Sequence, residues 1–192
     1  MPPIVREATL DDLPGYFDDM RAQLPDNGRD GVWFTTVRAS DADARFSPER
    51  LAEVAAACQR PVEEPRWMRV FIVEDEGRVV GHADLSGGPV ATMLHRCTLG
   101  LGLQRPYRGR GLGRALMDAA IGWARGAGLA WIDLGVVAGN ERARALYLEL
   151  GFVEVGRVPD RFRFDGASLT DIIMALDLGA LSSTAARGSM AR

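Results

Sequence analysis

The chain of 192 residues is 47% hydrophobic and 26% charged, a composition typical of one globular domain with a sizeable core. Its 23 basic residues are all arginines, so a Walker A lysine, the phosphate-binding lysine of a protein kinase and the Schiff-base lysine of a pyridoxal-phosphate enzyme are excluded. The net charge of -3 offers no general attraction to nucleic acid or to an anionic membrane surface.

The first part of the chain predicts one strand and two helices. Residues 4–8 form an apolar strand candidate. Thr9, with an acid three residues later, is typical of a capped helix start, and Ser47 before a proline predicts the start of a second helix. Between these helices, residues 25–46 are mostly polar and contain glycine, so we expect irregular structure there.

The rest of the chain alternates strands and helices. Expected strands cover 68–73, 79–85, 95–103, 129–137, a stretch from 152, 161–164 and 169–178, and expected helices cover 112–125 and 140–150. Hairpins at both ends with a strand-helix-strand-helix-strand passage between them predict an α+β fold with one partly parallel central sheet. We expect a single domain over 1–178, followed by a disordered serine- and alanine-rich tail over 179–192.

The spacing of the cysteines and the hydropathy of the chain indicate the cellular compartment. Cys58 and Cys97 lie far apart with no CxxC spacing, which indicates neither a disulfide framework nor a zinc cluster and fits a reducing compartment. The first residues contain no apolar signal core, and no run of about 18 uncharged apolar residues occurs. We therefore expect a cytoplasmic protein without a membrane partner.

A glycine- and arginine-rich segment joins the strand expected over 95–103 to the next helix. Gly109, Gly111 and Gly113 permit a tight turn that exposes the N–H groups of the first helical turn, a typical anion site. A helix N-terminus disfavours each nearby cation by roughly 0.3–1 kcal/mol, so a bound polyanion explains the arginines better than a solvated basic face does. These arginines are Arg105, Arg108, Arg110 and Arg114.

The polyanion is not a dinucleotide bound by a Rossmann loop. The GxGxxG pattern requires a third glycine or an alanine, and the two possible starting glycines place Arg114 or Leu116 there. A third interpretation of the arginines, RNA binding, predicts a steep salt dependence and weak competition by a nucleotide.

Two motifs carry a family resemblance. The segment Arg108-Gly109-Arg110-Gly111-Leu112-Gly113 resembles the Arg/Gln-x-x-Gly-x-Gly/Ala signature of the GNAT superfamily of N-acetyltransferases. Residues 140–152 are similar to its second motif, Asn-x-x-Ala-x-x-Leu-Tyr-x-x-x-Gly-Phe. The resemblance covers about residues 70–178 and implies a mostly antiparallel central sheet with splayed parallel strands in the middle, flanked by helices.

The resemblance implies acetyl-CoA as co-substrate and no metal. Its diphosphate would be held by residues 108–113, and its pantetheine arm would lie between the strand ending at Leu103 and the strand ending near Val137. Gly100 and Gly102 share one strand face, which indicates either close approach of this arm or room for a neighbouring side chain. The cofactor-binding residues are then Leu101, Gly102, Leu103, Arg108, Gly109, Arg110, Gly111, Leu112, Gly113, Asn140 and Ala143. A plain helix N-cap explains Asn140 equally well.

The implied reaction is direct acetyl transfer from the thioester to a primary amine. The resemblance makes Tyr147 the general acid for the leaving thiolate, although helical periodicity alone would make it a core-facing aromatic residue. A backbone N–H of Leu101 or Leu103 would polarise the thioester carbonyl. Cys97 as an acyl-carrying nucleophile is disfavoured, because strand cysteines are usually buried and no histidine is placed to activate it.

The general base cannot be carried over from the resemblance. In the ribosomal-protein branch of the family a glutamate stands five residues before the motif asparagine, and here that position is Gly135. His95 is the first candidate for the base. The alternatives are a water chain without a dedicated base or one of His82, Asp84 and Asp133.

We therefore expect an N-acetyltransferase acting on the primary amine of a small molecule. In the resembled family the N-terminal helices and the final hairpin form the acceptor pocket, which here implies Trp33, Phe34 and the hairpin residues 161–164. The hairpin arginines share one face, which indicates either a solvated edge or binding of a carboxylate-bearing, amino-acid-like acceptor. The alternatives are acetylation of a protein N-terminus or lysine and a CoA-binding module without turnover. Dimerisation is common in the resembled family and allows a homodimer, but no residue pattern indicates an interface.

Overall fold

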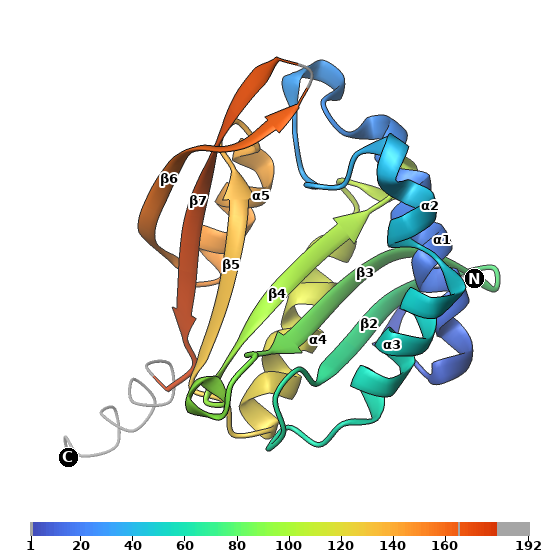
Figure 1. Cartoon of the computed structure of the whole chain (residues 1–192), viewed down its shortest axis with the longest axis vertical. Helices are drawn as coiled ribbons and strands as arrows, with labels where there is room; N and C mark the ends of the chain where they lie inside the picture. Colours follow the sequence, from blue (N-terminus) through green and yellow to red (C-terminus); the bar gives the residue numbers. More distant parts are fainter. Residues whose placement is uncertain (1, 165, 180–192) are drawn as a thin grey trace.

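The computed structural model describes residues 2–164 and 166–179, so the expected tail lies outside this part except for Gly179. In the described residues one sheet is flanked by helices on both faces (Figure 1). The strands are β1 (Ile4–Glu7), β2 (Met68–Asp75), β3 (Arg78–Gly87), β4 (Arg96–Leu103), β5 (Trp131–Val137), β6 (Val153–Phe164) and β7 (Ala167–Asp177). The helices are α1 (Leu13–Gln23), α2 (Ala42–Arg45), α3 (Pro48–Gln59), α4 (Leu112–Gly126) and α5 (Glu141–Glu149). No helix among these is long and apolar enough to cross a membrane.

The order of strands in the sheet is β1-β2-β3-β4-β5-β7-β6. All neighbours are antiparallel except β4 and β5, which pair only over Arg96–Thr98 and Trp131–Asp133. Beyond that point β4 continues beside β3 and β5 beside β7, so the two strands diverge (Figure 1). The predicted fold, a mostly antiparallel sheet with splayed parallel strands in the middle, is confirmed. The gap opens at the carboxyl ends of β4 and β5, where α4 and α5 begin.

Each face of the sheet carries its own core. On β2, Phe71 and Val73 pack in the cluster that contains α4, whereas Val70 and Ile72 pack with α1 and α3, as the two-residue period of a strand requires. On α4, Ala115 and Ala119 are only partly buried. The buried residues of α4 are Leu116, Met117, Ala120, Ile121 and Ala124.

The start of the first helical segment is stabilised by the predicted capping box and by an ion pair. The carboxylate of Asp12 accepts hydrogen bonds from the backbone N–H and the hydroxyl of Thr9, at 2.7 and 2.8 Å. Arg6 donates to both oxygens of this carboxylate at 2.7 Å and to Glu74 at 2.7 Å. The Arg6 guanidinium therefore holds the pKa of Asp12 well below its usual range.

Replacing Asp12 by alanine is expected to lower the free energy of unfolding by about 1–2 kcal/mol at pH 7, because a cap and a bidentate charge pair are lost together. A depressed carboxyl pKa contributes stability that is present above its unfolded value, near 4, and disappears as the pH falls through the folded value. Urea unfolding at pH 7 and at about pH 3 should thus show a larger difference at pH 7. The exposed neighbour variant Asp11→Ala is the control, and equal losses in both variants would contradict this account.

Candidate functional site

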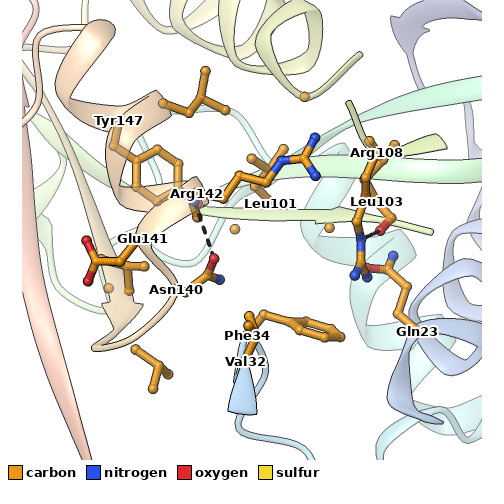
Figure 2. Close-up of a pocket in the computed structure, with 18 of the residues that line it drawn as sticks. Gln23, Val32, Phe34, Leu101, Leu103, Arg108, Asn140, Glu141, Arg142 and Tyr147 are labelled. Atoms are coloured by element: carbon orange, nitrogen blue, oxygen red, sulfur yellow. Dashed lines mark hydrogen bonds between the residues drawn. The ribbon is translucent and has the colours of Figure 1, made fainter. Parts of the chain in front are cut away.

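A groove of about 1230 Å³ lies where β4 and β5 diverge. Its walls come from the carboxyl ends of β4 and β5, the turn before α4, the first turns of α5 and the segment 23–36. Figure 2 shows Leu101 and Leu103 of β4 and Tyr147 of α5 around this space, with Val32 and Phe34 of the N-terminal segment across from them. Segments far apart in the chain therefore meet at the point where the sheet splits.

The turn before α4 has the backbone geometry of an anion site. Gly109 and Gly111 have φ values of +82° and +79°, a left-handed conformation that residues with a Cβ rarely adopt. Gly111 is the N-cap of α4, and in the described part of the chain no side chain caps this helix. The N–H groups of its first turn are therefore left for a ligand.

Arg108 lies at the edge of this turn and is only partly neutralised. Its Nε donates to the carbonyl of Leu103 at 2.7 Å, and its guanidinium lies over the ring of Phe34, 5.1 Å from the centroid. Burial lowers the pKa of Arg108, and although Asp26 opposes this effect, Arg105 and Arg142 add to it. An anion bound in the groove would compensate this partly desolvated cation.

The other residues of the arginine-rich motif differ in position. Gly113 and Arg114 line the groove, and Arg114 pairs with Glu149 at 3.1 Å. Arg110 and Leu112, both expected at the cofactor, do not line it. Arg110 lies over the ring of Tyr107, and Leu112 packs against the core. The ion pairs of the cluster weaken the RNA-binding interpretation, because part of its charge is already neutralised.

The glycines of β4 make room for side chains of β3. A Cβ on Gly100 would lie 2.7 Å from Oδ2 of Asp84, and a Cβ on Gly102 would lie 2.4 Å from Cε1 of His82. Of the two explanations for these glycines, space for a neighbouring side chain is therefore realised. Both glycines also line the groove, so β4 carries no side chain at two positions where a ligand would cross it.

Two of the candidate bases, His82 and Asp84, are held on the α1 side of the sheet. Nδ1 of His82 lies 2.7 Å from Oδ2 of Asp19, and Asp84 accepts a hydrogen bond of 3.3 Å from the hydroxyl of Tyr16. Burial raises the pKa of Asp84. Neither side chain lines the groove, which argues against direct contact with a substrate there.

The remaining candidates from the sequence do not line the groove either. His95, the first candidate for the base, is exposed just before β4 begins, at the opposite end of the strand from the groove, so the structure argues against this prediction. Asp133 accepts two hydrogen bonds of 2.6 Å from Arg96. Burial raises the pKa of Cys97 to about 12, which makes it a poor nucleophile. No group of three metal-ligating side chains occurs among the described residues.

Helix α5 brings the second motif to the groove. Asn140, labelled in Figure 2, accepts a hydrogen bond of 3.3 Å from the N–H of Ala143 and caps the helix, so the structural explanation of Asn140 is confirmed. Both residues also line the groove. Tyr147 lines it as well and is 6% exposed. Burial raises its pKa to about 12, so the phenol keeps its proton at neutral pH. Its hydroxyl makes no hydrogen bond within the described residues.

Only some of the residues expected at the acceptor pocket line the groove. Phe34 and Phe162 line the groove, but Trp33 stacks on Phe164 instead, with ring centroids 5.0 Å apart. The hairpin arginines do not line it, and Arg163 pairs with Asp160. The groove also contains Asp171 of β7, which the sequence reasoning missed. The only indication of Asp171 in the sequence is an acidic residue next to the apolar residues of this strand.

Comparison with known proteins agrees with this geometry. Residues 35–152 match the model of the acetyltransferase (GNAT) family. The mycothiol acetyltransferase of Beutenbergia cavernae is 47% identical over 55 residues, which are 29% of this chain and 18% of that protein. The N-alpha-acetyltransferase RimI of Mycobacterium tuberculosis is 34% identical over 95 residues, 47% of this chain and 56% of that protein. The chain thus spans less than two thirds of either curated relative.

A solved structure shares the fold. The GNAT superfamily phosphinothricin acetyltransferase from Sinorhizobium meliloti, in complex with AcCoA, superposes with a TM-score of 0.68. The alignment covers 92% of this chain and 89% of that one, at 20% sequence identity. At this identity the likeness concerns the arrangement of helices and strands.

Proposed function

The chain belongs to the GNAT family of acetyltransferases, and from this premise we propose that it transfers the acetyl group of acetyl-CoA to the primary amine of a small molecule. The observation that carries the proposal is the groove between β4 and β5, which joins an uncapped helix N-terminus to a buried, protonated tyrosine. An anionic, extended thioester substrate needs both features.

The residues of the groove suit acetyl-CoA along its length. The N–H groups of the α4 turn and Arg108 suit the diphosphate. Beyond Thr98 no residue of the described chain pairs with β4 on the β5 side, so its backbone can pair with the pantetheine arm as with an added strand. A backbone N–H of Leu101 or Leu103 is then available to the thioester carbonyl. When bound, acetyl-CoA supplies the activated acetyl group.

Tyr147 would complete the transfer by protonating the leaving sulfur. A thiol has a pKa near 8.5, so the thiolate leaves more readily if a proton donor stands beside it. The raised pKa of about 12 for Tyr147 keeps its proton in place until the sulfur needs it. A module that only binds CoA has no use for this proton.

Contacts between the N-terminal segment and the β6–β7 hairpin favour a small amine over a folded protein as the acceptor. Trp33 stacks on Phe164, and Nη2 of Arg38 donates to the carbonyl of Arg163 at 2.9 Å. These contacts join the N-terminal segment to the β6–β7 hairpin across the acceptor side. Acetylation of a protein N-terminus remains the second candidate because of the similarity to RimI. Neither Arg161 nor Arg163 lines the groove, and Arg163 is paired with Asp160, so the hairpin arginines give no support to a carboxylate-bearing acceptor.

The proposal is tested by calorimetry with acetyl-CoA and by thiol release with benzylamine, L-phenylalanine, a tripeptide with a free N-terminus and a lysine peptide. We expect acetyl-CoA to bind with a Kd between about 1 μM and 1 mM, and benzylamine to give the highest kcat/KM. Absence of binding heat would refute the function. Binding without thiol release would indicate a CoA-binding module, and preference for a peptide would identify a protein acetyltransferase.

A further inference from the structure

The carboxylate of Asp171 occupies the space beside Gly135. A Cβ on Gly135 would lie 2.8 Å from Oδ1 and 3.2 Å from Oδ2 of Asp171. In the β5–β7 pairing, Gly135 is opposite Ile173 and Val137 is opposite Asp171, so both side-chain positions share one face of the sheet. The missing side chain on β5 therefore lets an acid from β7 reach the groove.

Asp171 differs from the other acids of the groove because no residue in the described part of the chain forms an ion pair with it. Among the described residues, four other carboxylates line the groove, and each lies within 3.7 Å of an arginine: Asp26 with Arg29, Asp30 with Arg105, Glu141 with Arg144 and Glu149 with Arg114. Asp171 is only 8% exposed, and its carboxylate accepts no hydrogen bond within the described chain. Its oxygens are not among the fully buried, unpartnered polar atoms of the described residues, so the carboxylate is open to the groove, where a functional site can use it.

The surroundings of Asp171 offer little to stabilise its charge. Burial raises the pKa of Asp171, and the exposed Arg161 of β6 opposes this effect. Its neighbours on β5, Gly135 and Val137, carry no charge. A cation entering the groove would therefore find a carboxylate with unused hydrogen-bonding capacity.

We propose that Asp171 binds the ammonium group of the acceptor and takes a proton from it. This rests on the proposed acetyl transfer. A primary amine has a pKa near 8 for an α-amino group and about 10.4 for a lysine, so the acceptor arrives as a cation at neutral pH and must lose a proton before it can attack. Asp171 meets both needs, because it attracts the cation and its raised pKa makes it a better base than an exposed aspartate.

In the proposed transfer, every proton and electron pair has a donor and an acceptor. One ammonium proton moves to Asp171, and the nitrogen lone pair forms a C–N bond with the thioester carbonyl carbon. As the C–S bond breaks, the sulfur keeps the electron pair and takes the proton of Tyr147. The second proton lost by the nitrogen restores the phenol, and Asp171 releases its proton to solvent. The products are the amide, the thiol and one proton.

The Asp171→Asn variant tests this inference with benzylamine as the acceptor. At pH 7 we expect kcat/KM to fall by about 100-fold or more, with the Kd of acetyl-CoA and the melting temperature nearly unchanged. The defect should shrink as the pH approaches the pKa of the amine, because a free amine needs no base. The comparison is Asp84→Asn, which removes a half-buried carboxylate that does not line the groove and should change kcat/KM by less than about threefold.

A second measurement does not depend on turnover. The ¹³C signal of the Asp171 carboxyl group, identified by its loss in Asp171→Asn, should titrate above the ordinary aspartate range, and benzylamine should lower the midpoint because a cation favours the charged carboxylate. The inference is overturned if Asp171→Asn keeps the wild-type rate and pH profile, or if benzylamine leaves the titration unchanged. Failure of acetyl transfer itself differs from both outcomes, since the wild-type protein would then release no thiol with any amine.

Discussion

Replacing Tyr147 by phenylalanine is expected to lower kcat for acetyl transfer by about 100-fold or more, while the Kd of acetyl-CoA changes by less than about twofold. Tyr147 lines the groove, and its hydroxyl makes no hydrogen bond among the described residues, so removal of the hydroxyl leaves no other group unpaired. Packing of the ring against Phe152, with centroids 5.9 Å apart, is retained in the variant. The measurements are steady-state thiol release and calorimetry at the same pH.

Tyr107→Phe is the matched control for this variant. Tyr107 lies just before the glycine turn, but its hydroxyl donates to Asp75 at 2.8 Å and it does not line the groove. Its loss should leave kcat within about twofold of the wild type. If Tyr147→Phe keeps full turnover, Tyr147 is not the proton donor. If the Tyr147→Phe variant loses acetyl-CoA affinity by the same factor as kcat, the role of Tyr147 is to bind the co-substrate. Because the pKa of Tyr147 is about 12, no loss of activity from its ionisation is expected below about pH 11.

The parts of the fold that the sequence predicted well are those determined by neighbouring residues. The caps at Thr9 and Ser47 are local hydrogen bonds, and both are present. Strand β6 was predicted less well, as two pieces, because its register shifts between Val158 and Phe162, around Asp160 with a φ of +52°. Pairing with β7 keeps this irregular stretch in one strand, and a single sequence does not contain that information.

The same distinction between local and long-range determinants applies to the residues of the candidate site. The glycine turn and Tyr147 could be identified because each belongs to a continuous motif. The general base could not be identified in this way, because its identity depends on distances between residues that are far apart in the chain. His95 lies just before β4, at the end of that strand away from the groove. The space beside Gly135 of β5 is occupied by the carboxylate of Asp171 from the neighbouring strand β7. Such a relation depends on the β5–β7 register, which is a tertiary property.

Replacing Gly111 by valine is expected to weaken acetyl-CoA binding by about 100-fold or more. A β-branched residue is strained at a φ of +79°, so the turn shifts and the N–H groups at the start of α4 no longer point together. Losing two charge-assisted hydrogen bonds of about 1.5–3 kcal/mol each corresponds to a change of this size. Calorimetry with acetyl-CoA measures it directly.

Gly128→Val separates the ligand effect from backbone strain. Gly128 follows the other end of α4, has a φ of +76° and, like Gly111, has no atom within 4 Å of an added Cβ. Both variants should lose about 1–3 kcal/mol of stability, but only Gly111→Val should lose acetyl-CoA affinity. With acetyl-pantetheine as donor, which lacks the diphosphate, kcat/KM should be similar in the two variants. Equal losses of acetyl-CoA affinity would mean that α4 as a whole, and not the turn at its N-terminus, determines binding.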